Sequence, residues 1–128
     1  MASFYLTNRI MKKVLLLLSI IAVLASCERE QLVPNSEVPK WLKERIAQDE
    51  EILKTSTPSN LGIAAWMRFQ YDGNYFFEYL NLISSSFPPV YSFEGVKVML
   101  DQNDYQDYSK NKCCKKYVWK GPDYFEIN

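Results

Sequence analysis

Residues 63–83, IAAWMRFQYDGNYFFEYLNLI, decide the fold. Aromatic residues dominate both halves of this stretch, as expected for strands, and Asp72-Gly73 divides it. A two-residue turn of type I′ requires positive φ, which glycine adopts at little cost. We therefore predict an antiparallel hairpin with its turn at Asp72-Gly73.

Side chains alternate between the two faces of each predicted strand. In the first strand one face carries Ala65, Met67, Phe69 and Tyr71, and the other carries Ala64, Trp66, Arg68 and Gln70. In the second strand, Tyr75, Phe77 and Tyr79 share a face. Aromatic residues fill small cores and also bind sugars by stacking, so both interpretations stay open. If exposed, the predicted ligand-binding face comprises Trp66, Arg68, Gln70, Tyr75, Phe77 and Tyr79.

The flanking segments predict the remaining elements. Residues 39–56, PKWLKERIAQDEEILKTS, have a narrow apolar stripe at helical spacing and begin with a proline, which suits a first helical position. Residues 90–100, VYSFEGVKVML, predict a shorter hairpin around Glu94-Gly95, and residues 115–120, KKYVWK, an edge strand. The expected fold class is α+β: one N-terminal helix packed on a small three- to four-stranded antiparallel meander.

Residues 11–30, MKKVLLLLSIIAVLASCERE, have the layout of a secretory signal. Two lysines precede an apolar run that is too short for a transmembrane helix, which needs about 20 residues. Leu24-Ala25-Ser26-Cys27 resembles a bacterial lipobox, which implies lipidation of Cys27. We predict a signal peptide over residues 1–26 with translation starting at Met11, a lipidated cysteine and tether over 27–37, and a single domain over 38–128.

Composition restricts the function of the mature chain. The sequence contains no histidine, which excludes Ser-His-Asp and Cys-His catalysis within the chain. Removal of Arg9, Lys12 and Lys13 with the signal reduces the 15 basic residues to 12 against 15 acidic ones, a net charge near −3. This charge gives no reason to expect nucleic acid as a partner. We predict neither a cofactor nor a metal.

Adjacent cysteines, Cys113 and Cys114, are the most unusual dipeptide. Export would place them where disulfides form, and adjacent cysteines can close a strained bond. They could instead pair with another chain or stay reduced. The neighbouring Lys112, Lys115 and Lys116 would lower the pKa of the thiols and raise their reactivity.

Two acidic patterns are weaker candidates. Asp101, Asn103, Asp104 and Asp107 resemble a calcium loop but fail its spacing, so a solvated acidic turn is expected. Glu78 or Glu94 could serve as the acid of a glycan hydrolase, which needs two carboxylates and no histidine.

A pattern of helix and hairpin residues resembles a group of small bacterial lipoproteins of unknown activity. The matching residues are Pro39, Trp41, Leu42, Ile46, Phe69, Tyr71, Gly73, Phe76, Tyr91 and Gly95. The resemblance implies an envelope location and a small domain, and no functional residues carry over from it.

The expected function is therefore that of a non-enzymatic binding or structural module held by lipid to the inner or outer membrane. It would face the periplasm or the cell surface. An envelope glycan or another protein would be its partner. The alternatives are an inhibitor or immunity-type protein, which would act through a loop such as residues 84–89, SSSFPP, and the glycan hydrolase.

Overall fold

The computed structural model describes residues 9–16, 32–55 and 59–126. The chain divides into two units, residues 1–30 and 31–128, and residues 9–16 of the first are helical. The predicted lipidation site, Cys27, lies outside the described residues. Within these residues, no helix is both long and apolar enough to cross a membrane.

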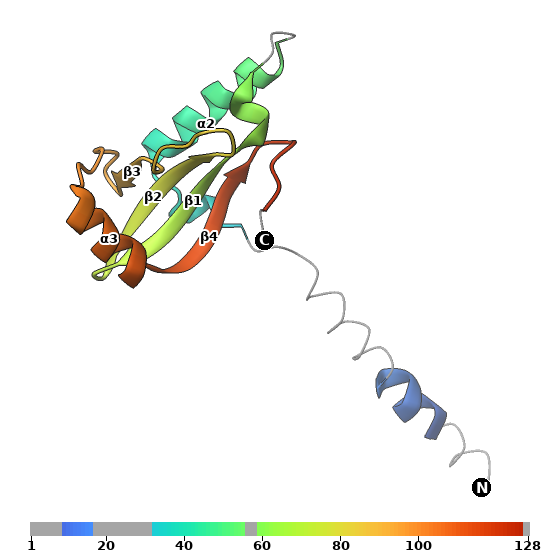
Figure 1. Ribbon diagram of the computed structural model, residues 1–128. Coiled ribbons are helices and arrows are strands. Elements are labelled where there is room, and N and C mark those ends of the chain that lie inside the picture. Colours follow the sequence, from blue (N-terminus) through green and yellow to red (C-terminus); the bar gives the residue numbers. More distant parts are fainter. Residues whose placement is uncertain (1–8, 17–31, 56–58, 127–128) are drawn as a thin grey trace, which may run out of the picture. The chain divides into compact units, whose positions relative to one another are not determined.

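A four-stranded antiparallel sheet forms the centre of the second unit (Figure 1). Its strands are β1 (Ala64–Tyr71), β2 (Asn74–Asn81), β3 (Val90–Ser92) and β4 (Cys113–Lys120). The order across the sheet is β3-β2-β1-β4, so the fourth strand returns to pair with the first. The α+β class is confirmed. The first three strands form the expected meander, and the return of β4 gives the sheet the strand order of a Greek key.

The turn between β1 and β2 has the predicted geometry. Asp72 has φ 49° and Gly73 has φ 74°, the two positive values that a type I′ turn requires. Tyr71 pairs with Asn74 directly beside the turn, and the register continues to Ala64 opposite Asn81. This hairpin therefore fixes which side chains share a face over the full length of both strands.

Helix α2 (Lys40–Leu53) packs across one face of the sheet, which we call the covered face. Leu42 of the helix meets Trp66 of β1 and Phe77 of β2 in the main core cluster. Pro39, the predicted first residue of the helix, instead precedes it in extended conformation, so the helix begins one position later than predicted. The narrow apolar stripe of α2 is therefore buried against the sheet, as predicted.

Residues 32–38 belong to the folded unit, contrary to the predicted tether over 27–37. Val33 and Val38 are buried in the same core cluster as Leu42. The amide of Val33 donates to the carbonyl oxygen of Tyr117 at 2.8 Å, so this segment also caps part of the edge of β4. A short 3-10 helix, η1 (Asn35–Glu37), lies between the two valines.

A second helix, α3 (Gln102–Asn111), replaces the expected acidic turn. The Asp101 carboxylate caps it by accepting a hydrogen bond from the amide of Asp104 at 2.8 Å. This is an N-cap contact, which explains why an acidic residue begins the segment. Tyr108 of α3 is buried against Tyr71 and Phe76, so the helix covers one end of the sheet face opposite α2.

The shorter hairpin is also present. Tyr91 of β3 forms a bridge with Lys97, and Gly95 in the turn has φ 88°. The turn packs on α2, because the indole N–H of Trp41 donates to the carbonyl oxygen of Phe93 at 2.8 Å. β4 is the edge strand predicted over residues 115–120, extended by two residues at its start.

Candidate functional site

The sequence-predicted binding face is the covered face, and much of it is core. Trp66 is 2% exposed and Phe77 is fully buried. Arg68 is also buried, with its guanidinium 4.2 Å from the ring centroid of Tyr75 and its Nη1 3.6 Å from the Glu37 carboxylate. The interpretation of this face as a binding surface depended on exposure, and these three residues do not meet that condition.

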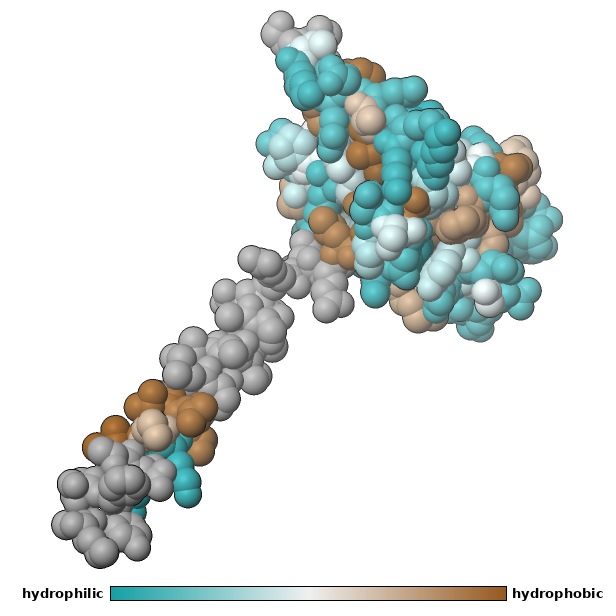
Figure 2. Space-filling view, turned by 180° about the vertical axis from the view of Figure 1, so that it is seen from behind, coloured by the Kyte–Doolittle hydropathy of each residue, from teal (hydrophilic) through white to brown (hydrophobic). Residues whose placement is uncertain are grey.

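The remaining members of that predicted set are spread across the face. Tyr75 and Tyr79 are half-buried beside Arg68 and Trp66, and Gln70 reaches toward Cys113. The exterior on this side, seen in Figure 2, is mainly hydrophilic, with apolar residues in small separate patches. Scattered apolar residues of this kind are ordinary for a protein surface.

The opposite face of the sheet is hollowed into a groove of about 570 Å³, which we call the sheet groove. α3 covers one end of this face, and the floor residues of β1 and β2 are largely buried, with Met67 5%, Phe69 8% and Glu78 1% exposed. The groove is lined by Met67, Phe69, Glu78, Leu80, Asn81, Leu82, Ser84, Pro88, Tyr105, Lys112, Lys115, Tyr117, Tyr124 and Glu126. Its volume lies within the usual range for small-molecule sites, roughly 300–1,000 Å³.

A buried ion pair lies in the floor of the groove. The carboxylate of Glu78, 1% exposed, accepts hydrogen bonds at Oε2 from Lys112 Nζ and from the Tyr108 hydroxyl, both at 2.8 Å. Lys112 Nζ also lies 4.1 Å from the ring centroid of Phe69. A buried carboxylate needs such partners, because an unpaired charge would be strongly destabilising.

Burial keeps Tyr108 a hydrogen-bond donor. Removal from water raises its pKa, and the neighbouring negative charge of Glu78 raises the pKa further. The phenol therefore stays protonated across the physiological range and donates permanently to Glu78. Tyr105, one turn earlier in α3, lines the groove, and its pKa is raised by burial and by Glu78 as well.

A second charged cluster lies at the rim. Glu126 accepts hydrogen bonds from the Tyr117 hydroxyl and from Lys115 Nζ, the latter at 3.3 Å. These contacts lower the pKa of Glu126, with the Tyr117 bond the largest cause. The hydroxyls of Tyr117 and Tyr124 lie 3.1 Å apart, so the segment that follows β4 folds back onto this strand. The rim thus holds an ionised carboxylate beside two phenols.

The electrostatics of the groove are balanced. Each of its two carboxylates, Glu78 and Glu126, has a lysine partner, so the lining supplies donors and acceptors without a net charge from these pairs. Three tyrosines, Tyr105, Tyr117 and Tyr124, contribute to the lining. This arrangement suits a neutral ligand that both donates and accepts hydrogen bonds and has apolar patches of its own.

The hydrolase candidates do not come together. Glu78 lies in the groove with its Oε2 engaged by Lys112 and Tyr108. Glu94 is exposed in the turn after β3 and does not line the groove. In the described part of the chain, no cluster of three or more histidine, cysteine or acidic side chains is placed to hold a metal ion.

A neighbouring apolar hollow of about 530 Å³ shares Pro88 and Tyr105 with the sheet groove. Phe87, 70% exposed, stacks on Tyr105 with ring centroids 4.2 Å apart. Met99, on the other side of the hollow, is 84% exposed. The loop predicted as an inhibitor segment therefore presents an apolar rim beside the groove.

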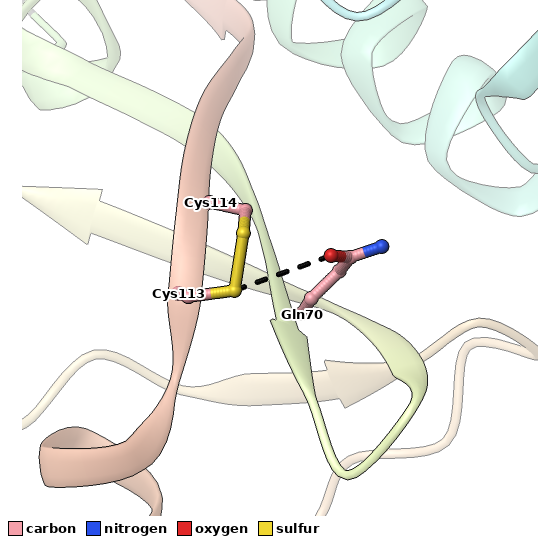
Figure 3. The surroundings of a disulfide bond; sticks show 3 residues. All are labelled: Gln70, Cys113 and Cys114. Carbon is pink, nitrogen blue, oxygen red and sulfur yellow. Dashed lines mark hydrogen bonds between the residues drawn. A yellow bond between two sulfur atoms is a disulfide. The ribbon is translucent and has the colours of Figure 1, made fainter.

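Cys113 and Cys114 form a disulfide at the start of β4 (Figure 3). Both residues are exposed, and Cys113 Sγ lies 4.0 Å from Gln70 Oε1 on β1. A disulfide sulfur carries no proton, so this approach is a contact in the oxidised protein and becomes a hydrogen bond only with a thiol.

Most residues of the groove were missed by sequence reasoning. Lys112 was considered as a neighbour of the cysteines and Tyr108 was not considered, although both hydrogen-bond Glu78. The signal that could have found the site is Glu78 itself, because it shares a strand face with Phe76 and Leu80. An ionisable residue on an apolar face predicts a charged partner from elsewhere in the chain.

Comparisons of the chain with protein families, with curated proteins and with solved structures found no match. The resemblance to small bacterial lipoproteins therefore stays a prediction.

Proposed function

We propose that this chain is a lipid-anchored protein of the bacterial cell envelope and that its folded unit is a non-enzymatic module that binds a neutral glycan segment in the sheet groove. The observation that carries the binding proposal is the groove itself, whose lining combines two carboxylate–lysine pairs with tyrosine side chains.

Sugar chemistry fits this lining. A pyranose has apolar C–H patches that stack on aromatic rings, and its hydroxyls both donate and accept. At the exposed rim, Glu126 offers an acceptor and Lys115 a donor, and the buried Lys112–Glu78 pair lies beneath them. A strongly charged ligand would instead have to break one of these pairs and leave a charge without its partner, which is costly near the buried Glu78.

The anchor proposal depends on the N-terminal sequence. Lys12 and Lys13, the apolar run and the Leu24–Cys27 motif support lipidation of Cys27. Only residues 28–32 separate Cys27 from the buried Val33, and an extended chain of this length spans roughly 20 Å. The folded unit would therefore stay close to the headgroup layer.

Glycan binding can be tested with two adjacent lysines. Lys115 lines the groove, whereas Lys116 pairs opposite Arg68 toward the other face. We expect Lys115→Gln to weaken binding of neutral oligosaccharides about tenfold, measured by titration calorimetry across a panel of neutral and anionic sugars. Lys116→Gln should leave binding unchanged. Equal losses in both variants, or tighter binding of the anionic sugars, would contradict the proposal.

Anchoring has a separate test. Cells expressing Cys27→Ala should lose incorporation of a radiolabelled fatty acid into the protein and should release it from the membrane fraction. A variant that stays in the membrane fraction with unchanged label would rule out the lipid anchor. This result would leave the groove proposal untouched.

The exposed apolar rim favours an inhibitor or immunity-type protein as the second candidate. Phe87 and Met99 are more exposed than expected for residues of their size, and they border one hollow. If a protein partner binds there, Phe87→Ser with Met99→Ser should abolish its cross-linking to the folded unit and leave oligosaccharide binding intact. Loss of oligosaccharide binding alone would favour the groove.

A further inference from the structure

The disulfide Cys113–Cys114 is accessible and lies at one end of an edge strand. Both cysteines are exposed, and β4 pairs on one side only, with β1. Figure 3 shows the two sulfurs beside β1, with Cys113 directed toward Gln70. A small thiol reagent can therefore reach the bond without unfolding the protein.

The backbone at this disulfide is in an unusual conformation. Cys114 has φ 65°, in the left-handed region, although it belongs to a strand. For a residue other than glycine this conformation is strained. The pairing register between β1 and β4 also shifts here, between Arg68 and Gln70. Opening the ring between the adjacent cysteines would let Cys114 return to an extended conformation.

The surroundings favour the reduced form in two further ways. Gln70 Oε1, 4.0 Å from Cys113 Sγ, gains a donor when the sulfur becomes a thiol. Lys116, two residues after Cys114, adds a positive charge near the pair that would stabilise a thiolate, whereas Lys112 and Lys115 are paired with carboxylates. A disulfide whose reduced form is stabilised in this way is easily reduced, the property of labile bonds rather than structural ones.

The pair is also connected to the groove through the chain. Lys112 directly precedes Cys113 and holds Glu78, and Lys115 directly follows Cys114 and holds Glu126. A change of φ at Cys114 rotates the backbone between these two lysines. The oxidation state of the cysteines should therefore alter the relative positions of the two ion pairs in the groove.

We propose that Cys113–Cys114 is a reversible thiol–disulfide exchange site for a dithiol reductant, and that its reduction repositions Lys112 and Lys115 in the sheet groove. The proposal does not depend on which ligand the groove binds. One thiolate of the reductant attacks a cysteine sulfur, and the S–S bond breaks to give a mixed disulfide and a cysteine thiolate. The second thiolate of the reductant then displaces the other cysteine. Two electrons and two protons pass to the protein, and the reductant becomes a cyclic disulfide.

The exchange can be measured on the folded full-length chain in detergent. The protein is equilibrated with mixtures of reduced and oxidised dithiothreitol, then alkylated and weighed by mass spectrometry. We expect full reduction with unchanged circular dichroism. Gln70→Leu, which removes the acceptor for the Cys113 thiol, should require about threefold more reduced reagent. Lys43→Gln, a substitution on α2, should leave the midpoint unchanged.

Coupling to the groove has an independent readout. In isotope-labelled protein, reduction should shift the side-chain resonances of Lys112 and Lys115 and the ring resonances of Tyr108. The double variant Cys113→Ser, Cys114→Ser should show the reduced positions without any reductant. A bond that resists reduction unless the protein unfolds would overturn the exchange site, and so would disulfide-linked dimers on a non-reducing gel. Reduction that leaves the lysine and tyrosine resonances unmoved would overturn the coupling.

Discussion

The two faces of the sheet are stabilised by different sets of contacts. On the covered face, α2 buries Leu42, Trp66 and Phe77, and aromatic rings pack edge to face, with Trp41 and Trp66 centroids 5.9 Å apart. On the groove face, α3 covers one end only, and Glu78 is buried among apolar neighbours with two hydrogen-bonding partners. Both faces thus have a buried apolar cluster, and the groove face adds a buried ion pair.

The polar groups of the covered face are less well satisfied. Within the described residues, Asp49 Oδ2, Trp66 Nε1 and Arg68 Nη1 are buried without a hydrogen bond. The Trp66 N–H lies near the Asp49 carboxylate and lowers its pKa, but burial has the larger effect and raises the pKa overall. The large apolar contact area of this face can offset such losses.

The largest expected contrast comes from two phenylalanines. Phe77→Ala on the covered face should lower the free energy of unfolding by about 4 kcal/mol, because it leaves a cavity that α2 cannot fill. Phe69→Ala in the groove floor should cost about 2 kcal/mol, since water can enter from the groove and no sealed cavity remains. Urea unfolding of both variants measures the difference. Equal losses would mean that the groove floor is packed as tightly as the core.

The buried ion pair gives the next contrast. Lys112→Met should cost about 3 kcal/mol, because Glu78 would keep only its bond from Tyr108. Adding Glu78→Leu should recover most of that stability, since an apolar pair of similar volume avoids the unpaired charge. The double variant should still fail to bind the groove ligand. A double variant that is stable and binds normally would show that the pair has no part in binding.

The hairpin and α2 were predictable because their signals are local. Asp72-Gly73 specifies its own turn, and the stripe through Leu42 and Ile46 specifies one buried helix face. The position of β4 was not predictable, because nothing in residues 113–120 indicates whether they pair with β1 or with β3. That choice depends on contacts distant in sequence, such as Val33 with Tyr117.

The assignment of the two faces failed for a similar reason. Alternation placed Trp66 and Phe77 together correctly, but both faces of the hairpin are aromatic, so the pattern could not show which one α2 would cover. Helix α3 was missed because its residues include several Asp, Asn and Tyr, which have weak helix preference. Its stability depends on Tyr108 reaching Glu78, a contact that only the folded sheet provides.

Glycine substitutions in two turns test whether the turn after β3 gains stability from its contact with α2. At Gly95, φ is 88° and an added Cβ would lie 2.8 Å from the Trp41 ring, so Gly95→Ala should cost about 2 kcal/mol. Gly73, with φ 74°, has nothing within 4 Å of such a Cβ, and Gly73→Ala should cost about 1 kcal/mol. Thermal unfolding of the two variants separates the backbone cost, which both share, from the contact with Trp41. Equal costs would mean that the turn at Gly95 is not packed against Trp41 of α2.

The smallest expected effects concern pH and have opposite signs on the two faces. The pKa of Asp49 is raised by burial, so its charged form opposes folding, and its contribution to stability declines as pH rises above its ordinary pKa of about 3.9. Asp49→Asn should therefore raise the melting temperature at pH 7 and lose this advantage near pH 3.

The pKa of Glu126 is lowered by Tyr117 and Lys115, so its contribution is present above its ordinary pKa of about 4.3 and is lost as pH falls through the folded value. Glu126→Gln should lower the melting temperature slightly at pH 7 and have no effect near pH 3. Salt should reduce the Glu126 effect more than the Asp49 effect, because only the former arises from exposed charges. If both substitutions change the melting temperature in the same direction at pH 7, the charged forms of Asp49 and Glu126 do not have opposite effects on stability, and the prediction is wrong.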